Sequence, residues 1–376
     1  MKLKQGSSSG EGEPLTYLKV SAPGRVCLFG EHQDYLGLPV IPCAISLRIS
    51  VAGKRRNDTV IILDLPDIKS TERFLVDESH RYVRERDYFR SAVNVLRRHG
   101  HTFSTGFDCE VRGDIPINSG TSSSSALIVA WVNFLTHMSD QNHSLDPKEA
   151  ARLAHEAEVL EFGEPGGMMD QYSTACGGIL HLEFQPEVKV EVLEANVKPF
   201  ILGDSHEPKK TKEILARVKN RVLDIARRLS ESENGFSLDT VATETLDRFS
   251  KRLTPEELAL LVGTVRNRDI TREARLALVS APLDHKKIGA LLWEHQSILR
   301  DVLHISTTKI DRMLDAAMEA GAFGGKINGS GGGGCMFAYA PESPELVREA
   351  VERSGGKGYV VVKDSGVRIE SPGGWN

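Results

Sequence analysis

A short segment of small residues, 116–127 (PINSGTSSSSAL), constrains the fold of this 376-residue chain more than any other. The residues before it, 107–112, alternate apolar and polar side chains, which predicts a strand. The residues after it, 126–135, form an almost unbroken apolar run, which predicts a buried helix. Gly120 lets the backbone approach a ligand, and the serines that follow can cap the helix. Because the N–H groups and dipole at a helix start favour anions, we interpret this joint as an anion-binding loop.

A serine-rich helix start also occurs as a purely structural turn, so this segment alone leaves both interpretations open. Two further glycine-rich segments favour a ligand site: residues 23–35 (PGRVCLFGEHQDY) and residues 326–335 (KINGSGGGGC). Three such segments on one chain suggest one composite site.

Charge and apolar patterning exclude several classes of partner. The net charge of −5 provides no basic field for nucleic acid or anionic lipid. No apolar run approaches the roughly 20 residues of a membrane span, and no signal-peptide core follows Met1, so we expect a cytoplasmic protein. The cysteines are widely spaced and form no CxxC pair, which predicts buried free thiols at Cys27, Cys43, Cys109, Cys176 and Cys335.

The length predicts two domains at roughly 150 residues each. Residues 1–14 are small and polar, and we expect them to form a flexible tail. Residues 15–204 then form the first domain, with strands near 17–21, 40–51, 179–184 and 199–203, and helices at 87–99 and 147–162. The last of these helices begins at Asp146-Pro147, an N-cap acid followed by proline.

Residues 205–376 form the expected second, helix-rich domain. Amphipathic patterns predict helices at 209–230, 255–266, 269–279, 286–303, 309–320 and 344–353. Strands are expected at 324–329, 335–340 and 359–363. The whole pattern is α+β, with helices covering a mostly antiparallel sheet.

The P-loop pattern and the signatures of protein kinases are absent from the sequence. A phosphoryl-transfer site needs an anion cradle, a metal ion, an acid that orients the acceptor hydroxyl, and positive charge. Each has a candidate here. The cradle is the loop itself, with Pro116, Ser119, Gly120, Ser122, Ser123, Ser124 and Ser125.

Oxygen ligands for Mg²⁺ are available at Ser124 and on the 147–162 helix, at Glu158 or Glu161. Either glutamate taken alone also fits a solvated helix face. Asp170 lies in an apolar, glycine-flanked segment, a placement typical of a functional acid, although it also fits a helix N-cap. Arg25 can hold Asp170 ionised or bind phosphate.

A second polar cluster, Glu31, His32 and Asp34, is flanked by Phe29 and Tyr35. It suits a polyhydroxylated ligand better than a metal ion.

Together these segments resemble the GHMP small-molecule kinases, and within them the galactokinases. Residues 23–35 are similar to the galactokinase signature GRxNLIGEHTDY, residues 116–127 to the family's second motif PxxxGLSSSAA, and residues 324–335 to its glycine-rich third motif. Residues 169–171 and 294–301 also look galactokinase-like, and related mevalonate-type kinases share much of the latter. The resemblance spans about residues 20–340.

This resemblance implies a fold with a ribosomal-protein-S5-like N-terminal domain, a ferredoxin-like C-terminal domain and a site between them. It implies ATP and Mg²⁺ as co-substrate and cofactor, with Asp170 as base, Arg25 beside it, and Ser124 and Glu158 as Mg²⁺ ligands. The sugar-contacting positions are Glu31, His32, Asp34 and the backbone around Gly167. The implied reaction converts galactose to galactose 1-phosphate.

The chain departs from the family pattern at Cys27 and Gln33, and no tyrosine matches the one that galactokinases place against the sugar, near Arg217 or Val218. A kinase for another hexose, a pentose or a uronic acid therefore stays open. So does a catalytically silent sensor of sugar and ATP, although Arg25, Glu158 and Asp170 speak against it.

Overall fold

A six-stranded sheet organises the N-terminal half of the computed structural model, which describes residues 17–76, 79–117, 119–164, 166–209 and 211–370. The sheet has the order β12-β1-β2-β5-β3-β4, and its neighbours are antiparallel except for β3 and β5, which run parallel. Its strands are β1 (Tyr17–Phe29), β2 (Ile41–Arg55), β3 (Val60–Leu65), β4 (Ser70–Leu75), β5 (Phe107–Gly113) and β12 (Arg368–Glu370).

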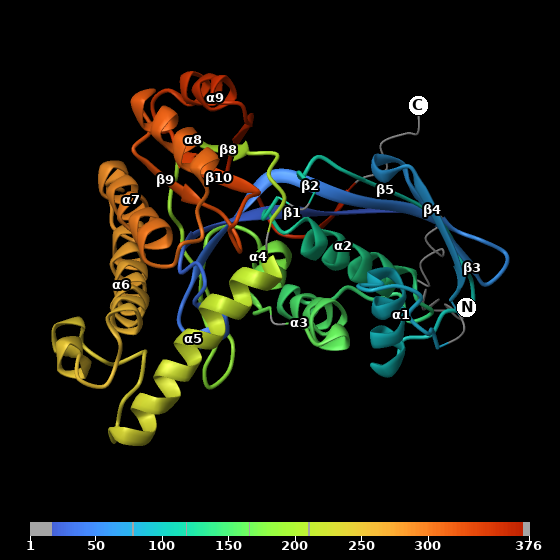
Figure 1. The fold of residues 1–376 in the computed structure, drawn as a ribbon. Helices are drawn as coiled ribbons and strands as arrows, with labels where there is room; N and C mark the ends of the chain where they lie inside the picture. Colours follow the sequence, from blue (N-terminus) through green and yellow to red (C-terminus); the bar gives the residue numbers. More distant parts are fainter. Residues whose placement is uncertain (1–16, 77–78, 118, 165, 210, 371–376) are drawn as a thin grey trace, which may run out of the picture.

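Helices cover one face of this sheet (Figure 1). They are α1 (Tyr88–Arg98), α2 (Ser123–Met138), α3 (Pro147–Glu158) and α4 (Met169–Cys176). The apolar α2 lies in the middle, where Trp131 and Phe134 stack on each other and Phe134 meets Phe107 of β5. The predicted buried helix is thus confirmed, and its burial fixes the serine-rich start of α2 against the end of the sheet.

The C-terminal half is built on an antiparallel four-stranded sheet of order β11-β8-β10-β9. Its strands are β8 (Phe200–Asp204), β9 (Gly324–Ile327), β10 (Cys335–Tyr339) and β11 (Lys357–Val361). Helices α8 (Thr308–Glu319) and α9 (Pro344–Arg353) pack on it, while α6 (Pro255–Leu278) and α7 (His285–Asp301) lie beside it and α5 (Thr211–Ser232) extends in front (Figure 1). A small hairpin pairs β6 (Leu180–Glu183) with β7 (Lys189–Val192).

One apolar cluster joins the two halves. It combines Phe29 and Ile41 of the first sheet with Phe200 and Phe337 of the second and with residues of α6 and α7. Strand pairing also crosses the boundary that we expected after residue 204, because β8 pairs with β10 and β11, and β12 pairs with β1. The two halves therefore share a core and strand pairing.

The α+β prediction is confirmed, with three corrections. The first strand does not end at Ser21 but continues through the first glycine-rich segment to Phe29, with a register shift between Pro23 and Gly24. The two helices expected at 255–266 and 269–279 are one helix, α6, because no helix-breaking residue separates them. The helix expected to reach 162 ends at Glu158 and is followed by a 3-10 turn, Leu160–Phe162.

Four strands and one helix were not predicted: β3, β4, β7, β12 and α4. The expected tail at residues 1–14 lies outside the described residues. All five cysteines are free thiols, as predicted, and Cys176 alone is only partly buried. Among the helices of the described ranges, none is both long and apolar enough to cross a membrane.

Candidate active site

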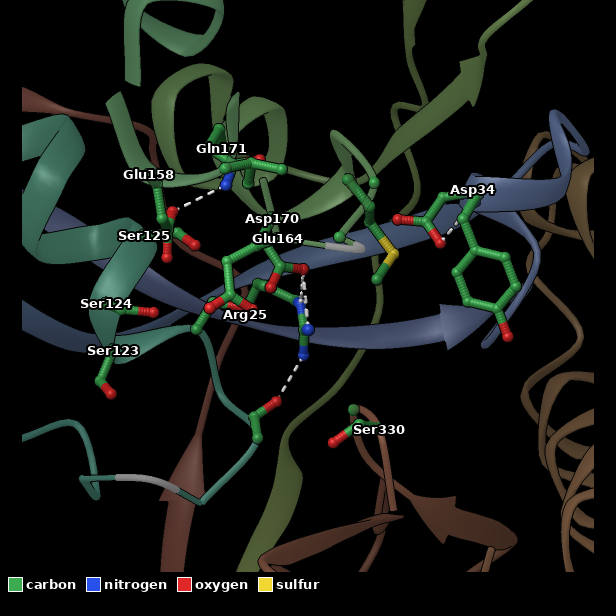
Figure 2. A pocket seen from close by; sticks show the side chains of 18 of the residues that line it. Arg25, Asp34, Ser123, Ser124, Ser125, Glu158, Glu164, Asp170, Gln171 and Ser330 are labelled. Carbon is green, nitrogen blue, oxygen red and sulfur yellow. Dashed lines mark hydrogen bonds and ion pairs between the residues drawn. The ribbon is translucent and has the colours of Figure 1, made fainter. Parts of the chain in front are cut away.

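A cavity of about 340 Å³ lies where the glycine-rich segments meet. Its walls come from β1 and the turn after it, the start of α2, the end of α3, the start of α4, and the third glycine-rich segment. Figure 2 shows its acidic and hydroxyl side chains pointing towards a common space.

The three glycine-rich segments contact one another directly. Asn328 donates from its amide to the Gly120 carbonyl at 2.9 Å, and its side-chain oxygen accepts from the Cys27 N–H at 2.9 Å. Gly120 has φ +95°, and a Cβ there would lie 2.5 Å from the Asn328 carbonyl oxygen. Only glycine tolerates both this backbone conformation and this contact, so Gly120 joins the second segment to the third.

The start of α2 presents its first turn to the cavity. Ser122, the N-cap residue, is left-handed (φ 59°, ψ 40°), and the Ala126 N–H donates to its carbonyl. The N–H groups of the first turn have no acceptor within the helix, and the positive end of the dipole lies there. Of the seven loop residues that we predicted to bind the nucleotide, five line the cavity: Gly120, Ser122, Ser123, Ser124 and Ser125.

The other two predicted loop residues do not line this cavity. The Ser119 hydroxyl donates to the Pro116 carbonyl at 2.7 Å, and the Ser119 carbonyl accepts from the Cys335 N–H at 2.6 Å. Pro116 and Ser119 thus shape the loop and tie it to the third segment.

Arg25 and Asp170 form an ion pair at the centre of the cavity (Figure 2). Arg25 contacts Asp170 Oδ1 through Nε at 2.9 Å and Nη2 at 2.8 Å, and its Nη1 donates to the Gly120 carbonyl at 2.6 Å. The side chain of Arg25 is 4% exposed and that of Asp170 is 32% exposed. Burial lowers the pKa of Arg25, but the carboxylates of Asp170 and Glu31 act against burial, and the pKa lies above its ordinary value.

Local structure places both members of this pair. The register shift in β1 brings the Arg25 N–H to the Thr121 carbonyl at 3.1 Å, under the loop. Asp170 lies in the first turn of α4, where the helix dipole favours a carboxylate, and Met168 rather than Asp170 is the N-cap residue.

Glu158 is a buried carboxylate at the end of α3, beside the serines of α2. Gln171 donates to its Oε2 at 2.7 Å. Burial raises the pKa of Glu158, while the hydroxyls of Ser124 and Ser125 and the Gln171 amide oppose that rise. The other candidate, Glu161, instead contacts Tyr82 and Arg98 and does not line the cavity.

No group of three or more His, Cys, Asp or Glu residues in the described part of the chain is arranged to hold a metal ion. Mg²⁺ commonly takes only one or two carboxylates and completes its shell with water and phosphate oxygens. One buried carboxylate beside a partly exposed serine hydroxyl therefore fits Mg²⁺ bound together with a nucleotide.

The opposite end of the cavity is acidic and rich in hydrogen-bonding groups. Glu31 accepts from Lys326 Nζ at 2.8 Å and from the Gly329 N–H at 3.0 Å. The ring nitrogens of His32 lie 2.7 Å from the Tyr35 hydroxyl and 3.1 Å from the Ser330 carbonyl. These contacts hold the side chains of Glu31 and His32 against the third glycine-rich segment.

Asp34 lies against Gly167 in the same end of the cavity. A Cβ on Gly167 would overlap the Asp34 carboxylate and lie 3.0 Å from Asp34 Cβ. Burial, reinforced by the neighbouring Asp170, raises the pKa of Asp34 to about 6. The structure thus brings together every residue predicted at the acceptor end.

Several residues of the cavity were not singled out from the sequence. Arg86, Tyr88, Glu164 and Lys209 line it, and Arg86 pairs with Glu164 through two hydrogen bonds of 2.9 and 2.8 Å. Arg86, Glu164 and Lys209 stand in ordinary charged stretches and Tyr88 at the start of a predicted helix, so no local pattern marks them. Lys326 is a fully buried partner of Glu31, which its glycine-rich neighbourhood does not reveal.

Neither candidate for the missing tyrosine reaches the cavity. Val218 is buried in the core of the C-terminal half, and Arg217 donates to the carbonyls of Leu303 and His304. Tyr35, from the first segment, lines the cavity instead.

The fold and the cavity define an ATP-dependent phosphotransferase that acts on an alcohol group. The chain belongs to the GHMP kinases: the family models "GHMP kinases N terminal domain" and "GHMP kinases C terminal" match residues 87–178 and 276–357. The model "Galactokinase galactose-binding signature" matches residues 12–55.

Individual relatives include both galactokinases and mevalonate kinases. The mevalonate kinase of Thermococcus onnurineus is 29% identical over 93% of this chain and 97% of its own length. The galactokinase of Mannheimia succiniciproducens is 28% identical over 94% of each chain.

Solved structures share the fold. Lactococcus lactis galactokinase complexed with galactose superposes with a TM-score of 0.83 at 22% identity, over 95% of this chain and 96% of its own. Methanococcus jannaschii mevalonate kinase gives a TM-score of 0.72 at 20% identity, over 94% of this chain and all of its own.

Proposed function

We propose that this protein is an ATP- and Mg²⁺-dependent sugar kinase that phosphorylates the anomeric hydroxyl of galactose to give galactose 1-phosphate. The observation that carries the proposal is the position of the Arg25–Asp170 pair, between the start of α2 and the acidic end of the cavity. The match of residues 12–55 to the galactose-binding signature supports galactose as the acceptor.

In this proposal the nucleotide phosphates bind at the N–H groups of the α2 start and the hydroxyls of Ser123–Ser125, next to Gly120 and Ser122. Ser124 and Glu158 hold Mg²⁺, which when bound neutralises charge on the phosphates. Pro116 and Ser119 support the loop without contacting the nucleotide.

Asp170 accepts the proton of the acceptor hydroxyl while the acceptor oxygen bonds to the γ-phosphorus. The bond from the γ-phosphorus to the β–γ bridging oxygen breaks, and ADP leaves. Arg25 keeps Asp170 ionised and oriented before the transfer. Glu31, His32, Asp34 and the backbone of Gly167 bind the sugar hydroxyls.

The charge of the acceptor end favours a neutral polyhydroxylated molecule over a carboxylated one. A carboxylate there would face Glu31, Asp34 and Asp170, and like charges in a partly buried site repel strongly. The neighbouring cations Arg25 and Lys326 are already paired with Asp170 and Glu31. This argument disfavours a uronic acid and also mevalonate, the acceptor suggested by the mevalonate kinase relatives.

The test is ADP release by the purified protein with Mg-ATP and a panel of acceptors: galactose, glucose, N-acetylgalactosamine, arabinose, mannose, galacturonate and mevalonate. We expect a dominant response to galactose that Asp170→Asn abolishes, with ADP affinity in the variant within about twofold of wild type. A dominant response to mevalonate or galacturonate would refute both the galactose assignment and the charge argument.

A further inference from the structure

The cavity needs a cation for the phosphoryl group during transfer, and the charge of Arg25 is already paired with Asp170. Its Nε and Nη2 are engaged by Asp170 and its Nη1 by the Gly120 carbonyl, in a side chain that is 4% exposed. A guanidinium held in this way neutralises Asp170 and positions the loop. Because Asp170 already compensates its charge, Arg25 offers a phosphoryl group less net positive charge than an unpaired cation would.

Two other cations line the cavity among the described residues, Arg86 and Lys209. Arg86 forms a two-bond pair with Glu164, which already uses its charge. Lys209 has neither a hydrogen bond nor an ion pair with any residue that the structure describes. It is therefore the cation in this lining that has no direct ion-pair partner among the described residues.

The backbone around Lys209 is fixed against the third glycine-rich segment. The Ser205 hydroxyl donates to the Gly334 carbonyl at 2.6 Å, and the Gly334 N–H donates to the Glu207 carbonyl at 2.8 Å. A Cβ on Gly334 would lie 2.9 Å from Lys209 Cγ, so the lysine stem packs on this glycine.

The same glycine lies beside the loop that starts α2. A Cβ on Gly334 would lie 2.5 Å from the Ser119 carbonyl oxygen, and the next residue, Cys335, donates its N–H to that carbonyl. The stem of Lys209 thus lies beside the backbone that leads into the start of α2, and its side chain lines the cavity. Its charge also acts on both members of the Arg25–Asp170 pair.

We propose that Lys209 is the catalytic cation that binds the γ-phosphoryl group of the nucleotide and compensates its charge during transfer, an inference that rests on the proposed kinase function. Burial and the nearby Arg25 lower the pKa of Lys209, as expected for an ammonium without a partner. A phosphate oxygen would supply that partner and the missing solvation.

The experiment compares Lys209→Met and Lys209→Arg with wild type, and uses Lys251→Met, an exposed lysine away from the cavity, as the matched control. The dissociation constants of Mg²⁺-AMP-PNP and Mg²⁺-ADP are measured by calorimetry without any acceptor. We expect Lys209→Met to weaken AMP-PNP about tenfold or more and to change ADP by less than about twofold, because only AMP-PNP carries a γ-phosphoryl group.

Turnover provides the second readout. We expect the kcat of Lys209→Met to fall about 100- to 1000-fold, and that of Lys209→Arg to stay within about tenfold of wild type, because the positive charge is retained. Lys251→Met should match wild type in both assays. Thermal unfolding of each variant shows whether the fold is retained.

Equal weakening of AMP-PNP and ADP, or no weakening of either, would overturn the role of Lys209. Because the binding measurement contains no acceptor, it gives the same answer whether galactose or another alcohol is the substrate. A failed galactose assay combined with selective loss of AMP-PNP binding would refute the acceptor assignment and support the role of Lys209.

Discussion

Adding one methyl group at Gly167 should disrupt acceptor binding without harming the fold. A Cβ there would overlap the Asp34 carboxylate and lie 3.0 Å from Asp34 Cβ, so rotation of the carboxylate alone does not relieve the contact. Gly167 does not have a positive φ, so alanine brings no backbone strain. The effect of Gly167→Ala is therefore transmitted through Asp34, or through the displacement of residue 167 itself.

The expected loss in kcat/KM follows from two free-energy costs to Asp34. An off-rotamer side chain costs about 0.5–1.5 kcal/mol, and a lost hydrogen bond to a charged group about 1.5–3 kcal/mol. The sum is about 2–4.5 kcal/mol, which corresponds to about a 30- to 2000-fold loss in kcat/KM for the sugar.

The assay measures initial rates against galactose at saturating Mg-ATP, together with the dissociation constant of ADP. Gly166→Ala is the matched control, because its Cβ would lie 3.6 Å from Val159 Cγ2, an ordinary contact. We expect ADP affinity to be unchanged in both variants. Equal kcat/KM values for Gly167→Ala and Gly166→Ala would refute the assignment of Asp34 to the acceptor.

Three further predictions concern groups around the cavity. The pKa of Asp34, raised to about 6 in the folded chain, means that the folded state holds this proton more tightly than the unfolded state. The resulting stabilisation is complete below pH 4 and is lost as the pH rises through about 6, so Asp34→Asn should raise Tm relative to wild type at pH 8 but not at pH 4. Glu158→Gln should raise the Mg²⁺ concentration for half-maximal activity about tenfold or more in a metal titration, while Tm at pH 7 does not fall. Ser122→Gly should preserve or raise Tm, because a left-handed non-glycine residue costs about 1–2 kcal/mol, whereas Ser122→Val should lower it. An opposite order of the two Ser122 variants in thermal unfolding would contradict this.

Long periodic segments of this fold could be predicted from sequence, and short or irregular ones could not. The apolar run of α2 and the Asp146-Pro147 start of α3 carry strong local signals, and both helices form as expected. The strand β12 has three residues and exists only because it pairs with β1, which lies almost 350 residues earlier in the chain. Such non-local pairing leaves no local pattern to detect.

The residues of the candidate site likewise fall into a group with a local sequence signal and a group without one. Residues such as Arg25, Asp34 and Ser124 could be identified because they lie in glycine-rich or serine-rich segments that are recognisable in the sequence. Lys209 and Lys326 could not, because a lysine in a charged or glycine-rich stretch usually lies in solvent. Their roles depend on tertiary contacts: Lys209 packs on Gly334, and Lys326 pairs with Glu31 across the junction of the two halves.

The third glycine-rich segment links the two ends of the cavity mechanically. Asn328 binds the Gly120 carbonyl of the phosphate side, and the next residue, Gly329, donates its N–H to Glu31 of the acceptor side. Gly120 and Glu31 are thus held by adjacent residues of one tight turn, and Arg25 binds the same Gly120 carbonyl. Because a phosphoryl group is transferred efficiently only when donor and acceptor are aligned, a shared support of this kind fixes their separation without relying on either ligand. A change in this turn should therefore lower kcat more than it changes the affinity for either substrate.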